Sequence, residues 1–184
     1  GGKELGLFFG FNFPKKGAPP IIGLGHFTTS DFLWFYAYYF FFTISFYIFW
    51  ASYSPHKWQA WSILGSALIL FFTYYQVQVA VAVNNWYRPF YDAIQNALSD
   101  SSTTTASDLY GYILSFLILA MTYVLISIMT SFFVSHYVFR WRTAMNDFYT
   151  AKWALVRHIE GASQRIQEDT MRFASIMKTL GVSI

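Results

Sequence analysis

The sequence contains no cysteine and little charge. Without cysteine, disulfide bonds, zinc thiolate sites and cysteine nucleophiles are all excluded for this chain. Only 11% of the residues are Asp, Glu, Lys or Arg and 55% are hydrophobic, whereas a soluble domain carries about a quarter charged residues. Together with a mean hydropathy of +0.36, this composition predicts a membrane protein.

Signatures of nucleotide, metal and nucleic-acid binding are also missing. The sequence has no G-x-x-x-x-G-K-S/T motif for the phosphates of ATP. Its histidines (His26, His56, His136 and His158) stand far apart, without the spacing of metal ligands. The net charge of +3 is small, and no basic cluster stands apart from the apolar runs. We therefore expect no cofactor, no metal and no nucleic-acid partner.

The two ends of the sequence indicate a piece of a longer protein. There is no initiator methionine, and residues 176–184 resemble the opening of a further apolar run. Residues 1–20 lack the basic start and continuous apolar core of a signal peptide.

Three long apolar runs, at residues 32–53, 61–87 and 110–139, dominate the sequence. The first run would form a helix about 33 Å long, and a bilayer's hydrocarbon core is about 30 Å thick. A buried helix of a soluble protein is the alternative for one run, but three such runs favour membrane spans. Residues 1–31, rich in Gly, Pro and Phe, are expected to form a loop or an interfacial segment.

The basic residues predict how the chain is oriented. Residues 88–109 are expected to form a polar loop with one basic residue, in which Ser107 could cap the next helix. The short turn at 54–59 holds one lysine, and the segment 140–157 holds four basic residues. The positive-inside rule then places the turn and the segment after the third run in the cytoplasm, and the polar loop and residues 1–31 outside. The three lysines within 1–31 argue weakly against this placement.

The second run carries four amide side chains in its second half: Gln76, Gln78, Asn84 and Asn85. Amides within lipid need partners, so they should face other helices or a water-filled cavity. Hydrogen bonding between helices and contact with a substrate path are both open for them.

Residues 140–175 are expected to form two helical arms and an elbow at the inner face of the membrane. The third helix should continue into water until Gly161, and a new helix should begin at Ala162 or Ser163. Four charged residues of the second arm are spaced to share one helix face: Arg165, Glu168, Asp169 and Arg172. They can form a ladder of ion pairs, each contributing only about 0.3–0.5 kcal/mol, and a solvated helix face is the alternative.

His136 lies four residues before Arg140, near the expected inner boundary of the third span. Histidine titrates near neutral pH, so a proton site and a packing role are both open for it. With Arg140 and Arg142, it is expected at the cytoplasmic interface.

Several long words of the sequence carry a family resemblance: Ser54-Pro-His-Lys-Trp-Gln59, Trp61-Ser-Ile-Leu-Gly65, Asn85-Trp-Tyr87, Pro89-Phe-Tyr-Asp92, Phe133-Val-Ser-His-Tyr-Val-Phe-Arg-Trp-Arg-Thr-Ala-Met-Asn146 and His158-Ile-Glu-Gly-Ala-Ser-Gln-Arg-Ile-Gln-Glu-Asp-Thr-Met-Arg-Phe-Ala-Ser175. Over about residues 30–184 they closely resemble the SbmA/BacA family of bacterial inner-membrane peptide transporters. Leu68-Ile-Leu70, Gln78 and Asn84-Asn85-Trp86 are closer to the BacA branch.

The resemblance implies an all-α polytopic membrane protein. Residues 32–184 would be the first part of a transmembrane domain like that of an ABC exporter, without its ATPase and with long helices extending into the cytoplasm. Family members are homodimers of the inner membrane that import peptides with the proton gradient by alternating access. Their cargo includes microcins, other antimicrobial peptides and bleomycin-like compounds. The implied partners are the lipid bilayer, a peptide substrate and a second copy of the chain.

The resemblance also gives the charged elbow a function. Glu160-Gly-Ala-Ser-Gln-Arg165 and Glu168-Asp169 resemble a word of fatty-acyl ABC transporters at the cytoplasmic elbow. The candidates for proton coupling or a gate are Glu160, Arg165, Glu168, Asp169 and Arg172, and the amides of the second run are candidates for the substrate path. Lys178 stands where the family, by this resemblance, has a glutamate proposed to carry protons. A lysine cannot replace a carboxylate in that role, so another acid takes the part or the coupling differs.

Two other functions remain open. The chain could belong to an ATP-driven exporter of lipid or very-long-chain fatty-acyl groups, whose ATPase lies elsewhere. It could also be a structural membrane subunit without transport.

Overall fold

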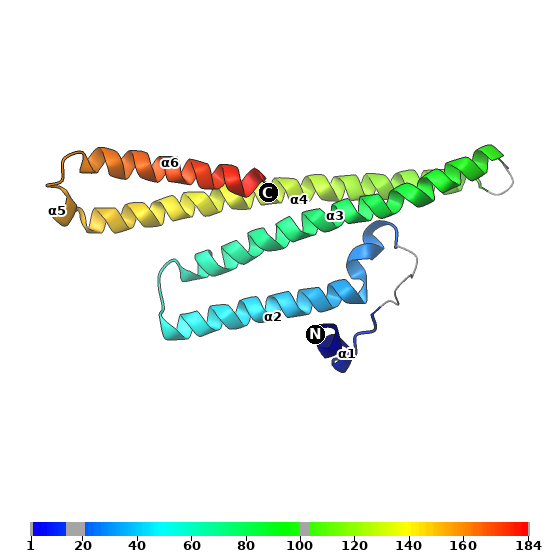
Figure 1. Ribbon diagram of the computed structural model, residues 1–184, viewed down its shortest axis with the longest axis horizontal. Helices are drawn as coiled ribbons and strands as arrows, with labels where there is room; N and C mark the ends of the chain where they lie inside the picture. Colours follow the sequence, from blue (N-terminus) through cyan, green and yellow to red (C-terminus); the bar gives the residue numbers. More distant parts are fainter. Residues whose placement is uncertain (1, 14–20, 100–103, 184) are drawn as a thin grey trace. The chain divides into compact units, whose positions relative to one another are not determined.

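The computed structural model describes residues 2–13, 21–99 and 104–183, and these residues form helices without any strand (Figure 1). The elements are α1 (Gly2–Phe8), the 3-10 helix η1 (Gly23–Thr28), α2 (Ser30–Tyr53), α3 (Gln59–Ser99), α4 (Ala106–Ala151), α5 (Trp153–Val156) and α6 (Ala162–Ser183). Three of them, α2, α3 and α4, are long and apolar enough to cross a membrane. The predicted helical membrane protein is therefore supported.

Two of these helices are much longer than a bilayer requires. Helix α3 has 41 residues and α4 has 46, which at about 1.5 Å per residue makes them about 62 Å and 69 Å long. The hydrocarbon core is only about 30 Å thick. The expected spans 61–87 and 110–139 lie inside α3 and α4, and both helices must continue well outside the lipid.

The prediction of a polar loop at residues 88–109 is wrong for residues 88–99, because α3 continues to Ser99. Pro89 lies inside this helix, where it has no N–H to donate to the carbonyl of Asn85. The side chains of Trp86 and Ala93, seven residues or about two turns apart, are both buried, and this packing on one side of the helix outweighs the local signal of the proline.

Helix α4 begins with a capping box. The backbone N–H and the hydroxyl of Thr105 donate hydrogen bonds of 2.9 and 2.7 Å to Asp108 Oδ2, and the Asp108 N–H donates to Thr105 Oγ1 at 3.3 Å. The hydrogen bonds from Thr105 lower the pKa of the exposed Asp108 carboxyl below its ordinary 3.8. The expectation that Ser107 caps this helix was therefore wrong, because Thr105 precedes the helix and Ser107 lies within its first turn.

The expected continuous helix up to Gly161 ends earlier, at Ala151. The Lys152 N–H is shared between the carbonyls of Phe148 at 3.3 Å and Tyr149 at 3.2 Å, a pattern typical of a tightened last turn. The four-residue helix α5 follows. Gly161 then adopts φ +74°, a left-handed conformation that glycine reaches without strain, and α6 begins at Ala162 as predicted.

The chain packs as two compact units, Gly1–Phe46 with Tyr74–Ile126 and Tyr47–Thr73 with Ser127–Ile184. In the first unit, aromatic rings join η1 and α2 to α3: Phe27 stacks on Tyr75 with centroids 4.4 Å apart, and Phe35 lies 4.3 Å from Tyr74.

Trp86 joins α3 to α4 in the same unit. Its indole N–H donates to the carbonyl of Tyr112 at 2.8 Å, and its ring lies 4.5 Å from Phe90 and 4.8 Å from Phe116. The side chain is only 6% exposed, so this residue is a main packing anchor between the two helices.

In the second unit, α3 and α4 approach closely at Gly65. A Cβ atom at this position would lie 3.0 Å from Tyr137 Cδ2, and the Tyr137 hydroxyl is hydrogen bonded to Ser66 Oγ at 2.8 Å. Phe72 stacks on Phe133 two turns further along, with centroids 5.6 Å apart. A small residue that allows close backbone approach beside a polar contact is typical of membrane helix packing.

Candidate functional site

Helix α6 runs back beside the last turns of α4 (Figure 1) and is amphipathic. Ala162 and Ala174 of this face are buried at 8% exposure each, and Ile166 and Thr170 between them are half-buried. The repeat of four residues places these side chains on one stripe of the helix. Further along, Phe173 meets Trp141 of α4 with ring centroids 4.9 Å apart.

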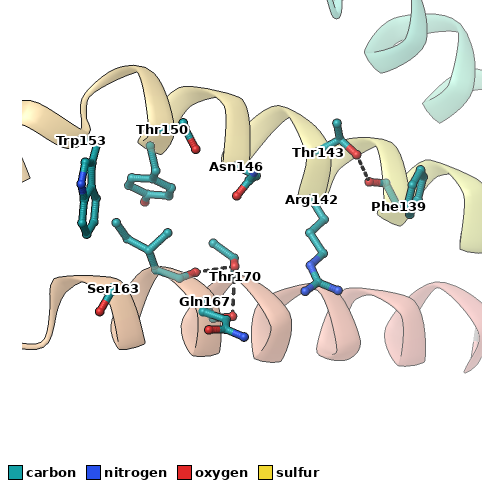
Figure 2. A pocket seen from close by; sticks show the side chains of 11 residues that line it. Phe139, Arg142, Thr143, Asn146, Thr150, Trp153, Ser163, Gln167 and Thr170 are labelled. Atoms are coloured by element: carbon teal, nitrogen blue, oxygen red, sulfur yellow. Dashed lines mark hydrogen bonds between the residues drawn. The ribbon is translucent and has the colours of Figure 1, made fainter.

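A cleft of about 710 Å³ lies between these two helices and α5 (Figure 2). It is lined by Phe139, Arg142, Thr143, Asn146, Tyr149, Thr150, Trp153, Ser163, Ile166, Gln167 and Thr170. Figure 2 shows Arg142 and Trp153 extending toward α6. Arg142 is the one charged residue of this lining, and no carboxylate belongs to it.

The polar groups of the cleft divide into satisfied and available ones. The hydroxyl of Thr143 donates to the carbonyl of Phe139 at 3.0 Å, and that of Thr170 donates to carbonyls of its own helix. Within the described residues, the side chains of Arg142, Asn146 and Gln167 have no ion pair or hydrogen bond to another residue. A guanidinium and two amides can donate to and accept from a peptide backbone or a carboxylate.

The predicted charged residues of α6 lie on the side of the helix turned away from α4. Glu168 and Arg172 form an ion pair at 3.6 Å, with side chains 55% and 72% exposed. Arg165 and Asp169 are also exposed, and neither makes an ion pair within the described part of the chain. The expected ladder is therefore reduced to one exposed pair, which contributes about 0.3–0.5 kcal/mol.

Glu160 and Lys178 are separate from that pair. Glu160 lies in the turn between α5 and α6, exposed and without an ion pair to any described residue. Lys178 is exposed near the end of α6. No group of three His, Asp or Glu side chains within the described residues could hold a metal ion.

The four amides of α3 do not line one face. Gln78 and Asn85 are seven residues apart and share a side of the helix, whereas Gln76 lies roughly opposite and Asn84 lies about a quarter turn or more away from both sides. Gln76 Nε2 donates to the hydroxyl of Tyr123 on α4 at 3.1 Å, and Gln78 Oε1 lies 3.5 Å from His26 Nε2. Gln76 and Gln78 thus bond to other elements of the chain, as the alternative of hydrogen bonding between helices predicts. Asn84 is exposed.

His136 sits among aromatic rings in the second unit. It stacks on Phe132 at 5.6 Å and meets Trp61 of α3 edge-on at 5.5 Å. The guanidinium of Arg140 lies 5.3 Å from the centre of the same Trp61 ring. These contacts favour a packing role for His136. Arg142, from the same predicted cluster, belongs instead to the cleft.

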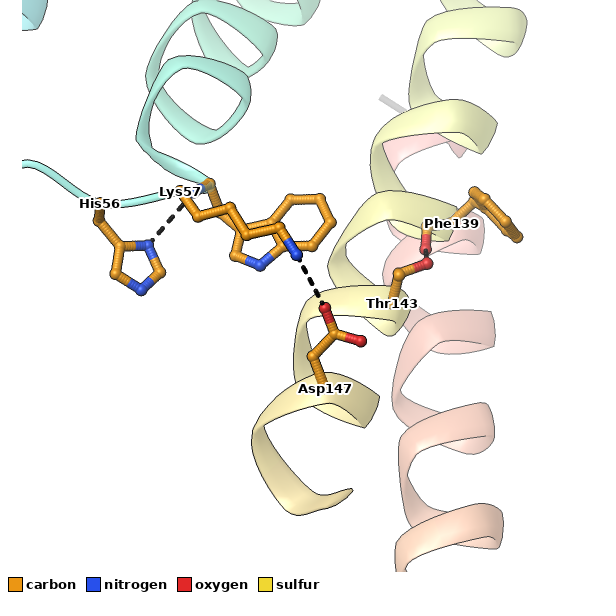
Figure 3. A network of polar contacts seen from close by, with 6 residues as sticks. His56, Lys57, Phe139, Thr143 and Asp147 are labelled. Carbon is orange, nitrogen blue, oxygen red and sulfur yellow. Dashed lines mark hydrogen bonds and ion pairs between the residues drawn. The ribbon is translucent and has the colours of Figure 1, made fainter. Parts of the chain in front are cut away.

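Sequence reasoning missed an ion pair that ties the turn before α3 to α4. Lys57 Nζ lies 3.3 Å from Asp147 Oδ2, with side chains 74% and 48% exposed (Figure 3). The two residues are 90 positions apart, so no local pattern reveals the contact.

The cleft was also missed, although it left a signal in the sequence. Arg142, Asn146, Tyr149 and Trp153 follow one another at intervals of four, three and four residues. This spacing puts a polar and aromatic stripe on one side of a helix. Attention to charge alone singled out the opposite, solvated face of α6.

Comparison with known families matches this architecture. A profile described as the SbmA/BacA-like family matches residues 55–184, a range that includes α3, α4, α5 and α6. The predicted resemblance is confirmed over more than half of the chain. This family points to membrane peptide transport and not to enzymatic catalysis. The chain has three helices long and apolar enough to cross a membrane. With the match over residues 55–184, it belongs to the SbmA/BacA-like family.

Proposed function

We propose that this chain is part of a proton-driven importer that carries peptides across the bacterial inner membrane. The observation that supports this most is the family match over residues 55–184. We propose that the transporter is a multi-pass homodimer working by alternating access, with a membrane domain of the ABC-exporter type that uses no ATPase. Antimicrobial peptides, microcins and bleomycin-like compounds are its proposed cargo.

The orientation of this importer follows from its charges. The ion pair between Lys57 and Asp147 brings the turn before α3 to the last turns of α4. The basic residues predict that both segments are cytoplasmic, and the contact supports the part of that prediction that puts them on the same side of the membrane. The cleft and α6 would then lie at the cytoplasmic end of the transport path.

We propose that the cleft between α4 and α6 receives the peptide as it leaves the membrane. Arg142, Asn146 and Gln167 have no partner within the described residues, and the rings of Tyr149 and Trp153 provide apolar surface beside them. Such a surface accepts many peptides, because it binds backbone amides and carbonyls that all peptides share. Broad cargo is consistent with a site of this kind.

The acidic residues on the outer face of α6 and in the turn before it are the proposed route for protons. Glu168 and Asp169 lie on the outer face of α6, and Glu160 lies in the turn before it. We propose that their exposed face is covered in a homodimer or by other parts of the transporter, where ionisable groups are costly to keep and are therefore functional candidates. Lys178 does not carry protons in this scheme.

Uptake of a labelled proline-rich peptide by cells that make the full-length protein tests the proposal. We expect uptake to collapse with a protonophore while the ATP level is clamped. Uptake that persists would contradict proton coupling and favour an ATP-driven exporter-type machine with a separate ATPase. No uptake above that of cells lacking the protein would contradict the peptide cargo.

The role of the acids is tested by Glu168→Gln, which removes the charge and keeps the shape. We expect uptake to be lost while the amount of protein in the membrane is unchanged. The matched control is Asp92→Asn, because Asp92 forms a similar exposed pair with Arg88 at 3.9 Å on α3 and has no proposed role. Normal uptake by the Glu168 variant would remove this residue from the coupling route.

A further inference from the structure

Two adjoining hollows lie where α3 meets α4 in the second unit, and they share Trp61 and Tyr137. The larger, of about 260 Å³, is apolar and is lined in addition by Ala60, Leu64, Gly65, Leu68 and Phe133. The smaller, of about 110 Å³, is lined in addition by Trp58, Ser62, Arg140, Trp141 and Ala144. The larger hollow is thus apolar, and the smaller one, called the polar hollow below, has the guanidinium of Arg140 in its lining.

Trp61, which lines both hollows, has an unused hydrogen-bond donor. The indole Nε1 of Trp61 is buried and has no hydrogen-bond partner within the described residues. A buried N–H without an acceptor is costly, so a ligand oxygen that reached this atom through a turn of the indole ring would relieve that cost. The hydroxyl of Tyr137, which lines the same hollows, is hydrogen bonded to Ser66 Oγ at 2.8 Å and does not accept from the indole N–H.

The polar hollow has an uncompensated positive charge. The guanidinium of Arg140 lies over the Trp61 ring, 5.3 Å from its centre, and no carboxylate of the described residues lies within ion-pair distance of it. Asp147, seven residues further along the same helix, is engaged by Lys57 at 3.3 Å. Because a cation over a ring keeps its own hydrogen-bond donors free, Arg140 can still bind an anion.

We propose that these two hollows form a binding site for one anionic phospholipid. Its phosphate would lie at Arg140, beside the Trp61 ring, and part of an acyl chain would lie along Leu64, Leu68 and Phe133. The inference rests on the membrane nature of the chain and on the expected end of the third span near residue 139, and it does not depend on the transported cargo.

The surroundings fit a lipid better than a free anion. Trp58, Trp61 and Trp141 gather at the polar hollow, and tryptophan is enriched at the level of the lipid headgroups. A free phosphate would use the donors of this hollow and leave the apolar one empty. A diacyl phospholipid fills both, with its charged and apolar parts in the order in which the chain presents them.

Native mass spectrometry of the full-length protein tests the site. The protein is purified from nanodiscs containing equal amounts of phosphatidylglycerol and phosphatidylcholine, and the lipids retained after collisional activation are counted. We expect phosphatidylglycerol to be retained several-fold more often than phosphatidylcholine. Equal retention of the two lipids by the unmodified protein would overturn the proposal.

Two variants separate the parts of the site. Arg140→Gln should lower phosphatidylglycerol retention to the level of phosphatidylcholine, whereas the matched control Arg157→Gln, at an exposed arginine beyond α5, should not. Leu64→Trp, which fills the apolar hollow, should lower retention of both lipids. If the Leu64 variant does not fold, the Arg140 comparison alone decides, because an unchanged preference in that variant refutes the site.

A competition arm distinguishes a lipid from a free anion. Inorganic phosphate at millimolar concentration should not displace bound phosphatidylglycerol, because it offers no acyl chain to the apolar hollow. Complete displacement by phosphate would mean that the polar hollow binds anions alone, and the lipid proposal would fail.

Discussion

Replacing Trp86 by phenylalanine keeps an aromatic ring between α3 and α4 but removes the N–H that donates to the carbonyl of Tyr112 at 2.8 Å. The carbonyl still accepts the helical N–H four residues on, so it is not left without a donor. We therefore expect a loss of about 1 kcal/mol in the free energy of unfolding, the usual net value of one hydrogen bond. Trp86→Ala also removes the contacts with Phe90 and Phe116 and should cost about 3–5 kcal/mol.

The measurement is unfolding of the full-length protein in mixed micelles by increasing mole fractions of SDS, followed by far-UV circular dichroism. Leu98→Ala is the matched control on the same helix, because Leu98 is 84% exposed and its truncation should change stability by less than about 0.5 kcal/mol. If the phenylalanine and alanine variants of Trp86 lose the same stability, ring packing contributes nothing and the reasoning is wrong. If neither differs from the control, Trp86 is no anchor.

Three further predictions concern the helix contacts. Gly111→Ala should stabilise α4 by about 0.5–1 kcal/mol, because nothing lies within 4 Å of the added Cβ, whereas Gly65→Ala should show no such gain because its Cβ meets a tyrosine ring at 3.0 Å; equal gains in SDS unfolding would contradict this. The hydrogen bonds that Asp108 accepts lower its folded pKa below 3.8. The stabilising effect of this carboxylate should therefore be complete above pH 3.8 and be lost as the pH falls through the folded pKa. If the stability difference between the unmodified protein and Asp108→Asn persists at lower pH, the capping box is not its cause. A double-mutant cycle of Lys57→Ala and Asp147→Ala should give a coupling below about 1 kcal/mol that weakens with salt, and its absence would show that the pair does not form.

The sequence predicted the elements that depend on local chemistry. Long runs without charge locate the cores of α2, α3 and α4, because a span must be both apolar and about 20 residues long. Gly161 predicted the start of α6 at Ala162, since a left-handed residue ends one helix and allows the next.

The remaining features depend on contacts between distant residues. Pro89 and its polar neighbours predicted a loop, but packing of Trp86 and Ala93 maintains the helix. No glycine or proline marks the end of α4 near Lys152. Nothing local shows that Asp147 meets Lys57.

The sequence predicted a candidate site from the charged residues of α6, whereas the structure shows a cleft lined mostly by uncharged residues. The charged residues of α6 share one face, as predicted from their spacing, yet that face points away from α4. The cleft depends on the residues between them, such as Gln167, and on Arg142 and Asn146 of the other helix. The pairing of two faces across a hairpin requires the geometry of the turn, which the spacing within one helix does not contain.

The proline inside α3 also has a consequence for the depth of this helix in the bilayer. Its missing N–H leaves the backbone carbonyl of Asn85 without its helical donor, and within hydrocarbon such a group costs several kcal/mol. Asn85 lies 24 residues after Trp61, about 36 Å along the axis, which exceeds the thickness of the hydrocarbon core. If Trp61 lies near one boundary of the hydrocarbon core, the carbonyl of Asn85 therefore lies beyond the other boundary, where water can bond to it. A deeper position of α3 would bury this carbonyl without a donor, so the proline limits how far the helix can shift into the lipid.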